Sequence, residues 1–138
     1  MKDVIDVLEE IADVEHWTCL PHSGASGDEL ALPPIITWRF KKPSPDLAAF
    51  IHGAISTFRG TLTWEFSATK RNWSLMPARI REYARAREYS GTLTAAEELK
   101  KTEPEVGIRA HADLRLLAAH LRYHLDLARD GSRASAGV

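Results

Sequence analysis

The stretch IITWRFKKPSPDLAAFIHGAISTFRGTLTWEF, residues 35–66, decides the fold of this chain. Five of its first six residues are β-branched or aromatic, and large apolar side chains alternate along it, which is typical of a β-strand. Ser44 and Pro45 then have the N-cap and first-position chemistry of a helix start, and apolar residues recur at helical spacing up to Phe58. Residues 61–66 alternate again, so they predict a second strand.

The segments on either side of this stretch complete the predicted fold. Trp73 and Leu75 follow a turn at 68–72 and predict a short third strand, which would return as a hairpin. A strand, a well-filled helix and a strand favour a right-handed parallel crossover. Residues 3–14 have apolar side chains at helical spacing and predict an N-terminal helix. We therefore expect an α+β fold, in which a small mixed sheet of about three strands, with a βαββ-like centre, packs with an N-terminal helix and C-terminal helices.

The remaining segments are predicted to form a loop and helices. Residues 18–34 are rich in glycine, serine and proline, so we expect an exposed loop there. Thr94 and Glu97 have the spacing of a capping box, and Pro104 and Gly107 are expected to interrupt the helical pattern. Three helices are predicted after the sheet, at residues 77–89, 95–101 and 109–129.

The size and composition fit one ordinary soluble domain. The chain has 138 residues, 44% of them hydrophobic and 27% charged, which excludes collagen-like and wholly disordered chains. We predict a single globular domain over residues 1–130 and a small, polar, disordered tail over residues 131–138. Cys19 is the only cysteine, which excludes an intramolecular disulfide and zinc sites of the Cys₄ or Cys₂His₂ type.

The start of the sequence predicts a cytoplasmic protein. Residues 1–6 alternate acidic with apolar residues, whereas a secretory signal has a basic start and an uninterrupted apolar run. No stretch approaches the 18 or so apolar residues that a membrane span needs. We therefore expect no membrane partner.

The formal net charge of −1 hides a strong segregation of charge along the chain. Residues 1–30 contain one basic and eight acidic residues, residues 31–91 contain ten basic and four acidic ones, and residues 92–138 contain seven of each. The whole chain is thus unlike the strongly basic domains that bind nucleic acid through bulk charge. A single basic face could still bind an acidic partner.

The basic residues are densest between Lys70 and Arg87, and this segment is the candidate partner-binding site. Arginine recognises carboxylates and phosphates through its planar fork of donors, and aromatic rings can stack on bases. The alternative is a solvated helix whose arginines pair with Glu82, Glu88 or the acidic N-terminal helix. The candidate binding residues are Lys70, Arg71, Arg79, Arg81, Arg85 and Arg87, together with Trp73 and Tyr83.

The last predicted helix, residues 109–129, has more apolar surface than one core needs. One stripe, which includes Leu114, Leu117 and Leu121, is the expected core face. A second apolar group falls toward the opposite side of the helix, so the helix either lies centrally in the domain or contacts another chain. The candidate oligomer-interface residues are Leu116, Tyr123 and Leu127.

The same helix contains the strongest candidate for a metal site. His120 and His124 are four residues apart, and Asp113 lies two turns earlier on the same flank. Two imidazoles and a carboxylate could bind a divalent metal ion, although the metalloprotease pattern HExxH is absent. Cys19 and His22 lie in a predicted loop, where neighbours in sequence rarely hold the geometry of a catalytic cysteine and its base.

The sequence thus favours a non-enzymatic binding protein, without a cofactor, over an enzyme. The first hypothesis is a small regulator, inhibitor or assembly component whose basic segment binds an acidic protein or nucleic acid. The second is a homo-oligomeric structural subunit that assembles through its last helix. The third is a small metal-dependent enzyme that uses His120 and His124.

Overall fold

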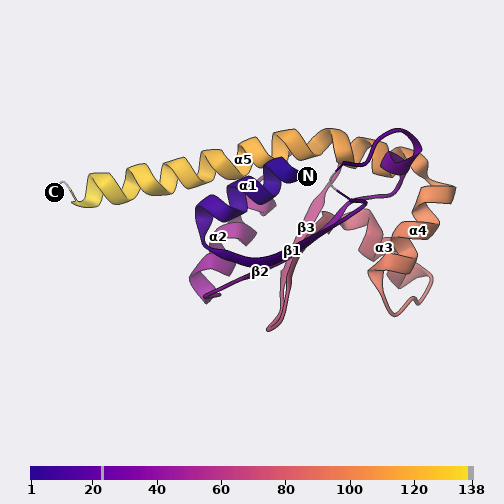
Figure 1. Cartoon of the computed structure of the whole chain (residues 1–138), viewed down its shortest axis with the longest axis horizontal. Helices are drawn as coiled ribbons and strands as arrows, with labels where there is room; N and C mark the ends of the chain where they lie inside the picture. The colour runs from indigo at the N-terminus through magenta and orange to yellow at the C-terminus, as the bar shows by residue number, and fades with distance from the viewer. Residues whose placement is uncertain (23, 137–138) are drawn as a thin grey trace.

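A computed structural model describes residues 1–22 and 24–136, with side chains described up to residue 131 (Figure 1). The elements in chain order are α1 (Lys2–Ile11), β1 (Val14–Leu20), the 3₁₀ helix η1 (Gly27–Ala31), β2 (Ile35–Phe40), α2 (Pro45–Ser56), β3 (Trp64–Ala68), β4 (Trp73–Pro77), α3 (Ala78–Ala86), α4 (Thr92–Thr102) and α5 (Pro104–Ala136). The α+β fold is confirmed, with the predicted N-terminal and C-terminal helices.

The sheet has four strands in the order β1-β2-β4-β3, and each neighbouring pair is antiparallel. Since β2 and β3 both run antiparallel to β4, they point in the same direction, and α2 connects them. The predicted crossover between two parallel strands is therefore present, but the hairpin strand β4 lies between them. As a result every hydrogen-bonded pair is antiparallel, and the sheet is not mixed.

Strand β1 is the element that the sequence analysis missed, because residues 18–20 were assigned to a loop. β1 pairs with β2 from Val14 opposite Phe40 to Leu20 opposite Ile35. β1 is an edge strand, and most of its side chains are exposed. An exposed edge strand does not need the apolar alternation that marked β2, so its sequence carries little strand signal.

The two faces of the sheet pack against different helices (Figure 1). The larger cluster joins α1, α2 and α5 to the side chains of Ile36, Trp38 and Leu75. The smaller cluster joins α3 and α4 to Ile35 and Met76. Because neighbouring residues of a strand point to opposite faces, α3 and α4 cover part of the outer face of the sheet. The molecule thus has two separate cores.

The C-terminal helices differ from the prediction at their starts. The N-cap of α4 is Gly91 and no side chain caps it, so the predicted capping box of Thr94 and Glu97 is wrong. Helix α5 begins at Pro104, so Gly107 lies inside it and does not break it. Glycine is required at this position because a Cβ atom there would collide with the backbone of Ala31. α5 continues to Ala136, into the segment predicted to be disordered, and residues 137–138 lie outside the described residues.

Candidate functional site

The fold divides the basic segment 70–87 into three parts. Lys70 and Arg71 lie in the turn between β3 and β4, and both are exposed. Arg79 and Arg81 lie in the first turns of α3 and are half-buried. The last pair, at the end of α3, is exposed and consists of Arg85 and Arg87. The predicted continuous patch is therefore not one surface.

The arginines in the first turns of α3 are paired within the molecule. Arg79 donates to both carboxylate oxygens of Glu103, at 3.2 Å from Nε and 2.6 Å from the terminal nitrogen. These bonds lower the pKa of the Glu103 carboxyl group. Arg81 forms an ion pair with Glu65 at 2.8 Å and donates to the hydroxyl of Ser67 at 2.9 Å. Local pairing, the alternative to a binding role, thus applies to these two arginines.

The aromatic residues predicted to contact a partner are buried instead. Trp73 is 5% exposed and meets the ring of Phe40 edge-on at 5.0 Å in the larger core. Tyr83 is 4% exposed in the smaller core, with the guanidinium of Arg87 4.9 Å from its ring centre. Neither ring is free to stack on a base, because each ring is packed inside a hydrophobic core of the domain.

Strand pairing creates a basic surface that the sequence analysis did not identify. The end of β2 lies next to the turn between β3 and β4, and Nε of Arg39 donates to the carbonyl of Arg71 at 2.9 Å. We call this surface the basic sheet end. Its members are the exposed residues Arg39, Lys41, Lys42, Lys70 and Arg71.

Within the described part of the chain, no ion pair neutralises the basic sheet end. The start of β1 brings acidic residues nearby, and the amide of Lys41 donates to the carbonyl of Asp13 at 2.9 Å. None of the five basic side chains, however, forms an ion pair with a carboxylate among the described residues. This distinguishes the basic sheet end from the arginines at the start of α3.

A row of hydroxyl side chains crosses the outer face of the sheet beside Arg39. The strand register places Thr18 opposite Thr37, Thr37 opposite Ser74, and Ser74 opposite Ser67. The two serine hydroxyls are 2.8 Å apart. We call these four residues the hydroxyl row. No local sequence signal could have identified it, because each strand contributes only one member.

The second apolar side of α5 is exposed, as its helical spacing predicts. Leu116 and Tyr123 are each 59% exposed, and Leu127 is 49% exposed. The adjacent core residues Leu117 and Leu121 are fully buried. Of the two alternatives for this helix, a central position in the domain is therefore excluded.

Asp113 is a structural anchor rather than part of a histidine site. It is 1% exposed, and its carboxylate accepts hydrogen bonds from the amides of Thr61 and Leu62, the hydroxyl of Thr61 and the indole of Trp64, at 3.0–3.2 Å. Burial alone would raise its pKa, but these four bonds outweigh burial and lower the pKa of the carboxyl group. The proposed metal ligand is therefore committed to the loop between α2 and β3.

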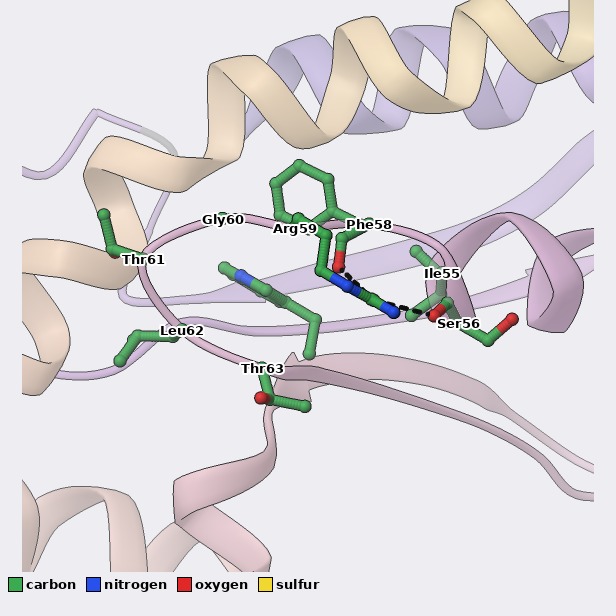
Figure 2. A pocket seen from close by; sticks show the side chains of 9 residues that line it. Ile55, Ser56, Phe58, Arg59, Gly60, Thr61, Leu62 and Thr63 are labelled. Atoms are coloured by element: carbon green, nitrogen blue, oxygen red, sulfur yellow. Dashed lines mark hydrogen bonds between the residues drawn. The ribbon is translucent and has the colours of Figure 1, made fainter.

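The loop that Asp113 holds encloses a small pocket of about 270 Å³ (Figure 2). The side chain of Arg59 lies across this loop and donates to the carbonyls of Ser56 and Phe58, each at 3.1 Å. The pocket is lined mainly by the loop itself. Its polar groups thus serve mainly to hold the loop together.

His120 and His124 lie together, but they bind α2. Their ring centres are 4.6 Å apart. The carbonyl of Ala54 accepts from Nε2 of His120 at 2.8 Å and from the Thr57 hydroxyl at 3.0 Å. The Thr57 hydroxyl oxygen is also 3.2 Å from Nε2 of His124. Burial, and secondly the charge of His120, lower the pKa of His124.

A metal centre has no support in the described residues. No three histidine, cysteine, aspartate or glutamate side chains in that part of the chain are grouped as metal ligands. Cys19 is half-buried in β1, and burial raises the pKa of its thiol, which keeps the thiol protonated and weakly nucleophilic.

Comparison with known proteins gives no family for this chain. No protein-family model, no curated protein and no solved structure matches it. Among the helices of the described residues, none is long and apolar enough to cross a membrane. The functional argument therefore depends on the geometry alone.

Proposed function

We propose that this chain is a non-enzymatic binding protein, a small cytoplasmic regulator, inhibitor or assembly component, whose basic sheet end binds an acidic protein surface. One observation carries the proposal. A hydrogen bond between Arg39 and Arg71 brings two short segments, 39–42 and 70–71, next to each other, and none of their five exposed basic side chains forms an ion pair with a described carboxylate. Basic side chains that no carboxylate of the described residues neutralises are available to an external one.

The neighbouring hydroxyl row supports an anionic partner. Thr18 and Thr37 lie across β1 and β2 from each other, and Thr37 is two residues from Arg39, on the same face of the sheet. Hydroxyls donate to carboxylate oxygens, and arginine binds them through two parallel hydrogen bonds. A carboxylate of a partner could therefore find both a cation and a neutral donor on this face.

The structure favours protein over nucleic acid as the partner class. Binding of nucleic acid commonly adds stacking of bases on aromatic rings to phosphate contacts. Trp38, Phe40 and Trp73, the rings nearest in sequence to the basic residues, are buried, although Trp17 on the neighbouring strand is 37% exposed. The acidic residues of segment 1–30 would also repel a polyanion that extends beyond the basic sheet end.

The test compares two variants of equal charge change. The variant K70E/R71E reverses two charges of the basic sheet end, and K100E/K101E reverses two exposed charges on α4. Poly-L-glutamate serves as the acidic probe and a short DNA duplex as the nucleic-acid probe. We expect K70E/R71E to weaken binding to poly-L-glutamate by about tenfold at low salt, since each reversed surface charge costs roughly 0.5–1 kcal/mol.

The control variant should bind the acidic probe as the unmodified chain does. Equal loss in both variants would mean that only net charge matters and would contradict a defined site. Binding of the DNA duplex without binding of poly-L-glutamate would overturn the choice of partner class. Thermal unfolding of both variants checks that the fold is retained.

A second candidate function, the homo-oligomeric subunit, is favoured by a separate observation. Leu116, Tyr123 and Leu127 are exposed along one side of α5. Exposed apolar residues that form a continuous stripe are typical of protein–protein contacts. Analytical ultracentrifugation tests this candidate: a mass of 15.4 kDa at all concentrations would contradict it.

A further inference from the structure

The exposed apolar side of α5 is a longer stripe than the three residues predicted from the sequence. Its members follow one another at spacings of four, four, three, four and four residues, so they line one side of the helix over about 30 Å. All of them are exposed. They are Ile108, Ala112, Leu116, Ala119, Tyr123 and Leu127.

The stripe is nearly symmetric about its small central residue, Ala119. Leu116 lies three residues before Ala119 and Tyr123 lies four after it. Ala112 lies seven residues before Ala119 and Leu127 lies eight after it. A second α5 that runs in the opposite direction would therefore place Leu116 against Tyr123 and Ala112 against Leu127.

We propose that two copies of this chain form a two-fold symmetric dimer in which their α5 helices pack antiparallel, with the axis beside Ala119. The inference rests on the homo-oligomeric candidate above, and it adds the partner's orientation and register. Two-fold symmetry requires a patch that is complementary to itself, and the stripe meets this condition. The large side chain of Leu127 in one copy meets the small side chain of Ala112 in the other. At the axis, the small side chain of Ala119 lets the two helices approach each other closely.

The charges beside the stripe fit the same register. Arg115 and Asp126 lie on one flank of the stripe, and both are exposed. In the antiparallel pair, Arg115 of each copy lies opposite residue 124 of the second copy, and Asp126 follows two residues later, about 3 Å further along the helix, within reach of the long arginine side chain. Arg122 lies on the same flank, but it is already paired with Glu10 at 3.0 Å and does not oppose Arg115 as a free charge.

The length of α5 also points to a second copy. Figure 1 shows the C-terminal part of α5 projecting beyond α1 and α2. A helical segment of only a few turns that packs against nothing is at best marginally stable in water. In the antiparallel dimer, Leu127 and the turns after it lie along the first half of the partner's α5, with Leu127 next to Ala112. The dimer therefore gives these turns the packing that the monomer lacks.

Disulfide cross-linking tests the orientation in a background without the native cysteine, Cys19→Ser. We expect Ala119→Cys to form a cross-linked dimer under mild oxidation, because the two copies meet at the axis. Ala112→Cys alone should stay uncross-linked, since its two copies lie about 22 Å apart and a disulfide needs Cα atoms within about 7 Å. The double variant Ala112→Cys/Leu127→Cys should cross-link again.

Sedimentation of matched leucine variants tests the stripe itself. We expect the unmodified chain to sediment with about twice its 15.4 kDa mass, and Leu116→Asp/Leu127→Asp to raise the dissociation constant at least about 100-fold. The control is Leu93→Asp, which changes a 48% exposed leucine on α4 and should leave the dimer intact.

The outcomes separate the two proposals. A monomeric unmodified chain would overturn both the homo-oligomeric function and the antiparallel arrangement. A dimer in which Ala112→Cys cross-links to itself would keep the homo-oligomeric function and overturn the proposed arrangement, because the two copies of residue 112 meet only in a parallel pair or in an antiparallel pair of another register. A dimer that survives Leu116→Asp/Leu127→Asp would place the interface elsewhere.

Discussion

The two sides of α5 contrast in a way that their hydrophobicity does not suggest. The inner side buries a carboxylate, Asp113, at 1% exposure. The outer side exposes Leu116 and Tyr123 at 59% each. The buried carboxylate is stable there because four hydrogen-bond donors surround it, whereas Leu116 stays largely in contact with solvent. What a helix face meets in the fold, and not its composition, decides whether the face is buried.

The largest effect is expected from the loss of the buried carboxylate. Asp113→Ala leaves two backbone amides and an indole without an acceptor, and it should lower the free energy of unfolding by about 4 kcal/mol. Urea denaturation measures this value. The outer-side control Asp126→Ala should change stability by less than about 0.5 kcal/mol at concentrations where the chain is monomeric. Similar losses in both variants would contradict the anchoring role.

Two adjacent leucines separate the two sides most directly. Leu117 is fully buried and Leu116 is 59% exposed. Leu117→Ala should cost about 3 kcal/mol because it opens a cavity in the larger core. Leu116→Ala should cost less than about 0.5 kcal/mol in the monomer. Urea denaturation of dilute samples measures both losses of unfolding free energy. A larger loss for Leu116→Ala than for Leu117→Ala would contradict the assignment of the faces.

Two glycines test how closely the inner side is packed. A Cβ atom at Gly60 would lie 2.5 Å from a carboxylate oxygen of Asp113, so Gly60→Ala should destabilise the fold by about 1–2 kcal/mol. Gly53 in α2 has nothing within 4 Å of such an atom. Gly53→Ala should stabilise the fold by about 0.5–1 kcal/mol, because alanine favours a helix more than glycine does. Thermal unfolding measures both effects: the melting temperature should fall in Gly60→Ala and rise in Gly53→Ala.

The smallest expected effect is a pH dependence of stability, caused by histidines that lie between the inner and outer sides of α5. Burial and the nearby His120 lower the pKa of His124, and burial lowers the pKa of His111. The unfolded chain therefore binds these protons more readily than the folded chain, and stability is lost as the pH falls below the ordinary histidine pKa of about 6.5. His124→Gln should reduce the loss between pH 7 and pH 5, leaving the contribution of His111. An unchanged slope in urea titrations would contradict this assignment.

The parts of the fold that were predictable carry strong local signals. β2, α2 and the β3–β4 hairpin combine clear alternation, a helix-start signal at Ser44 and Pro45, and a turn. The hydroxyl of Ser44 accepts from the amide of Leu47, as the cap prediction requires. β1 was missed because its side chains are mostly exposed. Gly107 was taken as a helix breaker because the nearby Ala31 backbone cannot be inferred from sequence.

The candidate site was predictable only in part, since it depends on pairing between distant segments. Helical spacing alone places Leu116 and Leu127 away from the core face of α5, and both are exposed, but their predicted role in an oligomer interface stays a prediction. The basic sheet end depends on Arg39 meeting Arg71, which only the order of the strands determines. Likewise, the donors to Asp113 lie about 50 residues away in sequence.

The division of the interior into two clusters has a consequence for how the molecule opens. α3 and α4 share one small cluster with Ile35 and Met76, and the pairing of Arg79 with Glu103 links the start of α3 to the end of α4. We expect these helices to detach and re-form as one cooperative unit, at a lower free energy than global unfolding. Their amide hydrogens would then exchange with solvent at a common rate, faster than those in the middle of α5. Such an opening would uncover the outer face of the sheet without disturbing α5.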